Sequence, residues 1–212
     1  MTNAVALFLE GARVVLDAIG DDAVGAAWDA PSVLEEQTVS SLAGHLARGG
    51  VWVVGDYLDA EVSAGEPDFA SAAAYYAGAL DHMTDDDHRA IRERGATIGA
   101  MGQDALVASL TDRLTMLEDR LRDEPGDRLV TVIAGRTIPL DEYLATRIIE
   151  QAVHLDDLAR SVGRVDGWPV PPEAEALVIA VGTDLAVRRH GAAAMVRALY
   201  RRGFADPTLP VL

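Results

Sequence analysis

The sequence predicts a mainly α-helical protein, built as a four-helix bundle with a small β-hairpin before the fourth long helix and extra helices at the C-terminus. Two features lead to this fold class. Four long segments repeat their apolar residues at helical spacing, and one short stretch before the last of them has the β-branched residues and tight turn of a hairpin. The chain has 212 residues, of which 50% are apolar, so a sizeable core is available.

The first two long helices are separated by a proline-containing loop. The first is expected over residues 3–20, where Gly20-Asp21-Asp22 ends the apolar repeat. Residues 28–37 are expected to form the loop. The second helix is expected to begin at Thr38, a residue type that caps helix N-termini, and to continue to about residue 62.

The middle of the chain is expected to hold two short helices and the third long one. The short helices are predicted over 68–81 and 84–94, and Gly95 to Gly102 is rich in small residues and expected to be flexible. The third long helix is predicted over 103–123. Its core face consists of leucines at helical spacing: Leu106, Leu110, Leu114, Leu117 and Leu121.

The hairpin is predicted from two strands, 128–133 and 136–138, joined by a turn at Ala134-Gly135. The fourth long helix is expected over 140–162. It has a polar stripe, which consists of Arg147, Glu150, His154 and Asp157, next to an apolar one. Because the two stripes are adjacent, the polar one is expected to face a cleft.

The C-terminal part is expected to be a helical extension that packs on the bundle. A linker over 163–172 is followed by predicted helices over 173–190 and 191–202, with an extended tail over 206–212. The sequence therefore suggests two units, a bundle over 1–163 and the extension over 164–212.

The composition narrows the range of partners and chemistry that the protein can have. The formal charge is −16, so the chain should repel nucleic acid and anionic membranes. No signal peptide or membrane span is evident, and we expect a cytoplasmic protein. The chain has no cysteine, so any thiol chemistry needs a thiol from a substrate or cofactor.

A glutamate and a histidine four residues apart suggest a metal site. Glu150 and His154 lie about 40° apart around a helix, one turn above each other, which suits two ligands to one metal. His45 in the second long helix is the best candidate for a third ligand. Two imidazoles, one carboxylate and an open position form the pattern of catalytic zinc, and also suit Fe(II) or Ni(II).

Each of these residues also has a structural interpretation. His45 lies next to the apolar stripe of its helix and would then be a hydrogen-bonded core residue. Glu150 would pair on the surface with Arg147 or Arg136. Asp157 either orients the imidazole of His154 from outside the metal site or is a solvated charge.

Other polar and aromatic residues are assigned more simply. Arg48 and Arg147 are candidates for holding a carboxylate of a substrate or thiol cofactor, with surface solvation as the alternative. Trp52 is expected to pack in the core rather than against the metal. Three further histidines are expected to be exposed: His82, His88 and His190. No role is assigned to Tyr75, Tyr76 or Trp168.

Several of these segments together resemble a known family. They are Trp28, the stretch from Thr38 to Arg48 followed by Trp52, and Asp141 to Arg147 leading into Glu150-Gln-Ala-Val-His154 and Asp157. They resemble the mycothiol-dependent maleylpyruvate isomerase family, an actinobacterial group of DinB-like metal-binding bundles.

The resemblance implies a divalent metal, usually zinc, held by His45, Glu150 and His154, and mycothiol or a similar thiol as cosubstrate. The implied activity is thiol transfer to, or isomerisation of, a small electrophile. The isomerase itself carries a separate C-terminal α/β domain, whereas residues after Gly163 here are predicted to be helical.

Two other functions stay open. One is a non-catalytic DinB-like module that binds a metal or small ligand, and the other is metal-dependent hydrolysis, for which no separate general base is evident. The expected partners are a small-molecule substrate and a thiol. The oligomeric state is open, with a homodimer formed through helix faces as one option.

Overall fold

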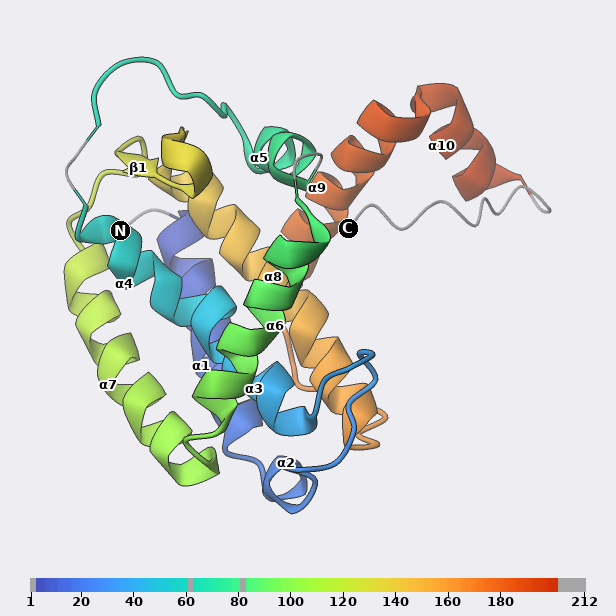
Figure 1. Cartoon of the computed structure of the whole chain (residues 1–212). Helices are drawn as coiled ribbons and strands as arrows, with labels where there is room; N and C mark the ends of the chain where they lie inside the picture. The colour runs from blue at the N-terminus through green and yellow to red at the C-terminus, as the bar shows by residue number, and fades with distance from the viewer. Residues whose placement is uncertain (1–2, 61–62, 81–82, 202–212) are drawn as a thin grey trace.

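The computed structural model describes residues 3–60, 63–80 and 83–201. The predicted class is confirmed: the fold is mainly helical, with one two-stranded antiparallel sheet in the described part of the chain. The long helices of the bundle are α1 (Asn3–Ile19), α7 (Gln103–Leu121), α8 (Leu140–Ser161), and a composite second helix (Figure 1).

The composite helix contains a widened turn that the sequence did not indicate. It consists of α3 (Val39–Ala47), a π-helical turn η1 (Arg48–Trp52) and α4 (Val53–Leu58). Thr38 is its N-cap as predicted, because its side chain accepts a hydrogen bond from the Ser41 amide. The helix ends at Leu58, short of the predicted end, and residues 61–62 lie outside the described part of the chain.

The core lies between these helices. The leucine stripe predicted for α7 is buried, with Leu114 and Leu117 at most 5% exposed. The largest fully buried side chains in the described part come mainly from α1, α3, α7 and α8, and include Phe8, Leu42, Leu110, Tyr143 and Leu144. The apolar repeats read in the sequence therefore correspond to the real core faces.

The prediction of a flexible segment after residue 94 was wrong. Helix α6 continues from Asp85 to Gly99, beginning at a capping box formed by Thr84 and Asp87. It packs across α3 (Figure 1). A Cβ added at Gly44 of α3 would lie 2.2 Å from the Gly95 carbonyl oxygen. The glycines that suggested flexibility therefore allow two helix backbones to touch.

The remaining elements of the bundle are short. Helix α2 (Asp22–Ala26) was not predicted, and α5 (Ala72–Leu80) begins later than expected. Strand β1 (Leu129–Thr131) pairs antiparallel with β2 (Thr137–Pro139), and Val130 faces Ile138. The connection is a short 3₁₀ turn, η2 (Ile133–Gly135). The hairpin is confirmed, with a first strand shorter than predicted and a second strand shifted by one residue.

The C-terminal helices are α9 (Pro172–His190) and α10 (Ala192–Tyr200), close to their predicted bounds. Helix α9 contacts α8, α5 and α1, and α10 extends away from the bundle (Figure 1). The predicted tail over 206–212 lies outside the described residues. None of the described helices has the length and apolar character that a membrane span requires.

Candidate metal centre

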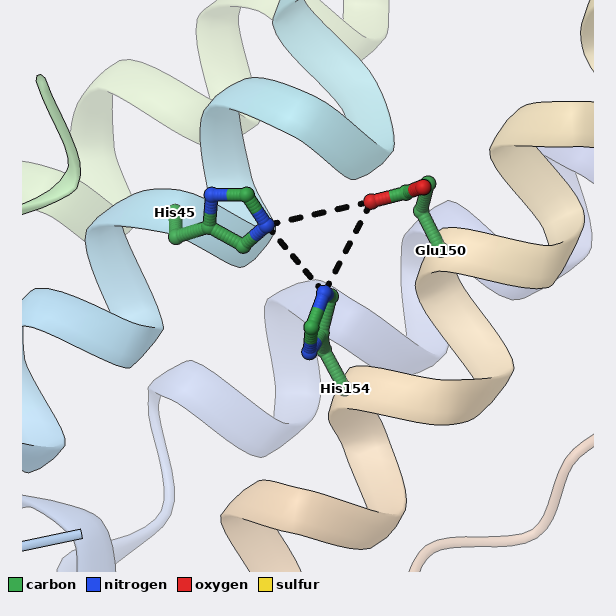
Figure 2. A group of neighbouring side chains, drawn as sticks. All are labelled: His45, Glu150 and His154. Atoms are coloured by element: carbon green, nitrogen blue, oxygen red, sulfur yellow. Dashed lines mark hydrogen bonds and ion pairs between the residues drawn. The ribbon is translucent and has the colours of Figure 1, made fainter. Parts of the chain in front are cut away.

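Three side chains from two helices converge in the centre of the bundle. His45 comes from α3, and Glu150 and His154 come from successive turns of α8 (Figure 2). The Nε2 atoms of the two histidines lie 3.1 Å apart. The Oε2 atom of Glu150 lies 3.8 Å from Nε2 of His45 and 3.6 Å from Nε2 of His154.

The widened turn η1 fixes how α3 and α8 lie relative to each other. Its carbonyl groups turn toward α8, where Nη1 of Arg147 donates to the Gly49 oxygen at 2.8 Å and Nε2 of Gln151 donates to the Gly50 oxygen at 2.9 Å. A π-helical turn often marks a functional site. Here the turn directly follows the helix that carries His45, so it fixes the position of His45 relative to α8.

A carboxylate orients the imidazole of His154. Nδ1 of His154 lies 3.0 Å from Oδ2 of Asp157, one turn further along α8, and Asp157 is buried. When the imidazole is neutral and keeps its proton on Nδ1, facing this carboxylate, the lone pair of Nε2 is directed at His45 and Glu150. Asp157 was interpreted either as a group that orients His154 or as a solvated charge, and this geometry matches the first interpretation.

The other oxygen of Glu150 has its own partners. The hydroxyl of Tyr76, in α5, donates to Oε1 of Glu150 at 3.1 Å, and Nη2 of Arg147 lies 4.0 Å from the same oxygen. Arg147 is buried, and its Nε donates to the Thr146 hydroxyl. Its guanidinium is therefore part of the framework of the site rather than a solvated surface charge.

These contacts shift the protonation equilibria. Burial opposes the charge of Glu150, but the neighbouring imidazoles of His154 and His45 and the charge of Arg147 outweigh it and hold the pKa of Glu150 well below its usual value. Burial likewise opposes the charge of His154, but Asp157 and Glu150 raise its pKa to about 9. Burial raises the pKa of the Tyr76 hydroxyl well above 10, so that it remains a donor.

The geometry fits a divalent metal. One ligand atom from each of His45, Glu150 and His154 can be chosen so that all lie within 4.8 Å of one another. Two ligands about 2.0–2.1 Å from a tetrahedral zinc are about 3.3 Å apart, close to the separations seen here. In the described part of the chain, this is also the one group of three or more histidine, aspartate or glutamate side chains that lie close enough to share an ion.

The cluster lies at the wall of a cavity of about 260 Å³. His45 and Glu150 line it, together with Arg48, Arg147 and Arg94 of α6. Its aromatic part consists of Tyr57, Tyr75, Tyr76 and Tyr143. Arg147 and Glu150 of the polar stripe of α8 therefore face a cleft, as the sequence predicted, whereas His154 and Asp157 of the same stripe do not line it. Trp52 does not line this cavity: it is buried in the core, with the guanidinium of Arg113 4.5 Å above its ring.

The other histidines lie elsewhere. His88 is exposed as expected, whereas His190, the last residue of α9, is half-buried. His82 lies outside the described residues. Sequence reasoning missed Tyr76 and Arg94 as site residues. Nothing local marks either one, since α5 and α6 reach the cavity only through tertiary packing.

The fold and cluster thus define a helical bundle with a His-Glu-His site inside it. The family model described as the mycothiol maleylpyruvate isomerase N-terminal domain matches residues 9–159. That range is more than half of the chain, and the chain belongs to this family.

Solved structures show the same fold. The crystal structure of the mycothiol-dependent maleylpyruvate isomerase and that of a histidine-to-alanine mutant of it each match with a TM-score of 0.50 and 16% identity. Each match covers 88% of this chain and 72% of the other. No curated protein matches the chain significantly.

Proposed function

We propose that the chain is a metal-dependent enzyme that activates a low-molecular-weight thiol, of the mycothiol type, for transfer to or isomerisation of a small electrophile. The observation that carries the proposal is the convergence of His45, Glu150 and His154 beside a cavity of about 260 Å³, which His45 and Glu150 line. Family membership supports the thiol, and the absence of cysteine from the chain requires that it come from outside.

The three side chains would hold one divalent metal, for which zinc is our proposal from the donor set. A metal in such a site lowers the pKa of a bound thiol, which makes the thiolate available near neutral pH. Asp157 keeps the Nε2 lone pair of His154 directed at the site. Tyr76 and Arg147 hold the second oxygen of Glu150.

The cavity would bind the thiol and the electrophile. Arg48 is half-exposed, with its Nη2 4.0 Å from Asp56, so its charge is only weakly paired and can hold a carboxylate. Arg94 on the opposite helix is a second cation at the cavity. Arg147 contributes its positive charge but few free donors, because its Nε and Nη1 already donate to the Thr146 hydroxyl and the Gly49 oxygen. The tyrosine rings reduce access of water to the reacting thiol.

Metal analysis tests the site. The wild-type protein, purified without chelator, should contain one divalent metal per chain, and His154→Ala should contain far less. His88→Ala is the matched control, because it removes an exposed histidine far from the cluster in sequence. Equal metal content in wild type and His154→Ala would remove the site as described.

Activity tests the chemistry. Turnover of a small electrophile should require both the metal and an added thiol, and chelation should abolish it. Activity that survives chelation, or that needs no thiol, would contradict the thiol-transfer proposal and favour hydrolysis. Metal binding without turnover of any electrophile would instead favour a non-catalytic binding module.

A further inference from the structure

The two oxygens of Glu150 have different surroundings. Oε2 points to the two histidine Nε2 atoms, as Figure 2 shows, whereas Oε1 points to Tyr76 and Arg147. A carboxylate on a helix can rotate and exchange its oxygens unless one of them is held. The hydrogen bond from Tyr76 at 3.1 Å supplies that constraint.

The Tyr76 hydroxyl is itself firmly placed. It also lies 3.0 Å from the Thr146 carbonyl oxygen, one turn before Glu150 on α8. The side chain of Tyr76 is only 4% exposed. Its ring belongs to a small buried cluster with Ala73, Ile149 and Leu185, which is separate from the main core. The hydroxyl has one proton, which it shares between these two acceptors on α8, and its ring is fixed by the packing around it.

Helix α9 closes this cluster from the outside. Leu185 of α9 is 1% exposed, and Val181, Val178 and Leu177 of the same helix pack against the cluster. On the other side, the first turn of α5 is joined to α8, because the Ala72 amide donates to Glu142 at 2.8 Å. Tyr76 is thus held between the C-terminal extension and the helix that carries Glu150.

We propose that Tyr76 is a positioning residue for Glu150, and that helix α9 acts on the metal site by seating the Tyr76 ring. The C-terminal extension would then stabilise the ligand geometry of the bundle without contributing a ligand. This inference rests on the proposed metal site. It assigns a role to Tyr76 and to α9 for which the sequence indicated none.

The test measures metal affinity rather than activity. Zinc dissociation constants would be determined by competition with a chelator for the wild type, Tyr76→Phe and Tyr143→Phe. Tyr76→Phe keeps the ring and removes the hydroxyl, so we expect an affinity about 10–100-fold lower, as for other groups that orient a ligand. Tyr143→Phe removes a hydroxyl at the same cavity that makes no hydrogen bond to Glu150, and should bind zinc as the wild type does.

A second arm tests the link to α9. Leu185→Ala should also lower zinc affinity, but should cause no further loss in the Tyr76→Phe background, since both changes act on one contact. Leu121→Ala, which removes an equally buried leucine at the end of α7, should lower stability and leave zinc affinity unchanged. Circular dichroism would show that each variant is folded. The Leu185 arm tests the proposal independently of the hydroxyl deletion.

The outcomes separate the two proposals. If Tyr76→Phe binds zinc as tightly as the wild type while His154→Ala loses it, the positioning role is wrong and the metal site stands. Fully additive losses in Tyr76→Phe and Leu185→Ala would overturn the link through α9. If the wild type binds no zinc, the proposed metal site itself is wrong and the inference falls with it.

Discussion

His154 has a different partner at each ring nitrogen, and this arrangement explains how one residue can be both oriented and available as a ligand. Asp157 holds Nδ1 at 3.0 Å, while Nε2 faces His45 and Glu150. The i, i+4 spacing in the sequence was sufficient to select Glu150 and His154. The choice of Asp157 followed from one further helical turn, and the geometry agrees with it.

Replacement of Asp157 by asparagine tests the orienting contact. Asp157→Asn keeps the size of the side chain but removes its charge, so the imidazole becomes a weaker and less well-fixed ligand. We expect a roughly 10–100-fold lower metal affinity without loss of the fold. Asp156→Asn, one residue away and exposed, is the control. Chelator competition measures both, and equal affinities for the two variants would contradict the role of Asp157.

The protonation of His154 and Glu150 predicts a pH dependence for the metal-free protein. The pKa of His154 is raised from 6.5 to about 9, so its contribution to stability is complete below pH 6.5 and is lost as pH rises through 9. The depressed pKa of Glu150 gives a contribution that is present above pH 4.5 and is lost only as pH falls through its lower folded-state pKa. Of these two contributions to stability, only that of His154 changes between pH 6.5 and pH 9.

Urea unfolding of the metal-free protein at pH 6.5 and at pH 9 measures this change. The unfolding free energy should fall by on the order of 2–3 kcal/mol in the wild type. His154→Gln should lose most of that pH dependence. Metal affinity should change in the opposite direction and increase with pH, because the ligand must be the neutral imidazole. A pH dependence that is identical in wild type and His154→Gln would contradict this account.

At the scale of elements, α3 and α6 cross closely and line one part of the cavity, through His45 and Arg94. A Cβ at Gly44 would lie 2.2 Å from the Gly95 oxygen and 2.6 Å from the Gly99 nitrogen, both backbone atoms. Gly44→Ala should therefore force the helices apart and cost roughly 1–3 kcal/mol or more. It should also weaken metal binding, because His45 is the next residue.

Gly182→Ala is the matched control for this substitution. Gly182 lies in α9, where an added Cβ would meet nothing within 4 Å. There the change should be neutral or stabilise the protein by about 0.5–1 kcal/mol, through the higher helix propensity of alanine. Denaturant midpoints compare the two variants. A Gly44→Ala protein as stable as Gly182→Ala would show that the close helix crossing is not required.

Elements with strong periodicity could be predicted, and those defined by contact could not. The apolar repeats of α1, α7 and α8 are properties of single segments, so their positions follow from the sequence. The end of α6 depends on the fit of Gly95 and Gly99 against α3, and local propensity alone favours a flexible segment there. The widened turn η1 likewise depends on hydrogen bonds that its carbonyls receive from α8.

The same distinction holds for the site. The three candidate ligands and Asp157 could be found because they lie at helical spacing or in a motif. Tyr76 and Arg94 could not be found in this way. Tyr76 reaches the cavity from the short helix α5, and Arg94 reaches it from α6, whose end was predicted too early. Arg147 was placed at the cleft, but its buried contacts with Gly49 and Thr146 became evident only in the folded structure.

At the scale of the whole molecule, the extension and the bundle share a core. Trp168 and Ala174, from the predicted extension, belong to the same buried cluster as Phe8 and Leu42. Arg164 pairs with Asp21 at 3.2 Å. The division into 1–163 and 164–212 stays a prediction, and these contacts suggest that the two parts are coupled in folding.

Thermal unfolding tests that coupling. Far-ultraviolet circular dichroism and tryptophan fluorescence should report one coincident transition, because the extension shares the main core. Two separated transitions would show that the bundle and extension are independent units. The same experiment on Trp168→Ala should show a lower midpoint, since removal of a buried aromatic side chain costs about 3–5 kcal/mol.

We propose that His45, Glu150 and His154 hold a metal that activates an external thiol. Titration of the cobalt-substituted protein with a low-molecular-weight thiol, followed by absorption spectroscopy, examines this step itself. We expect a saturable thiolate-to-cobalt charge-transfer band near neutral pH, below the pH at which a free thiol, with a pKa of about 8.5, ionises. His45→Ala should show no such band. A wild-type spectrum that the thiol leaves unchanged would show that the site does not bind a thiolate.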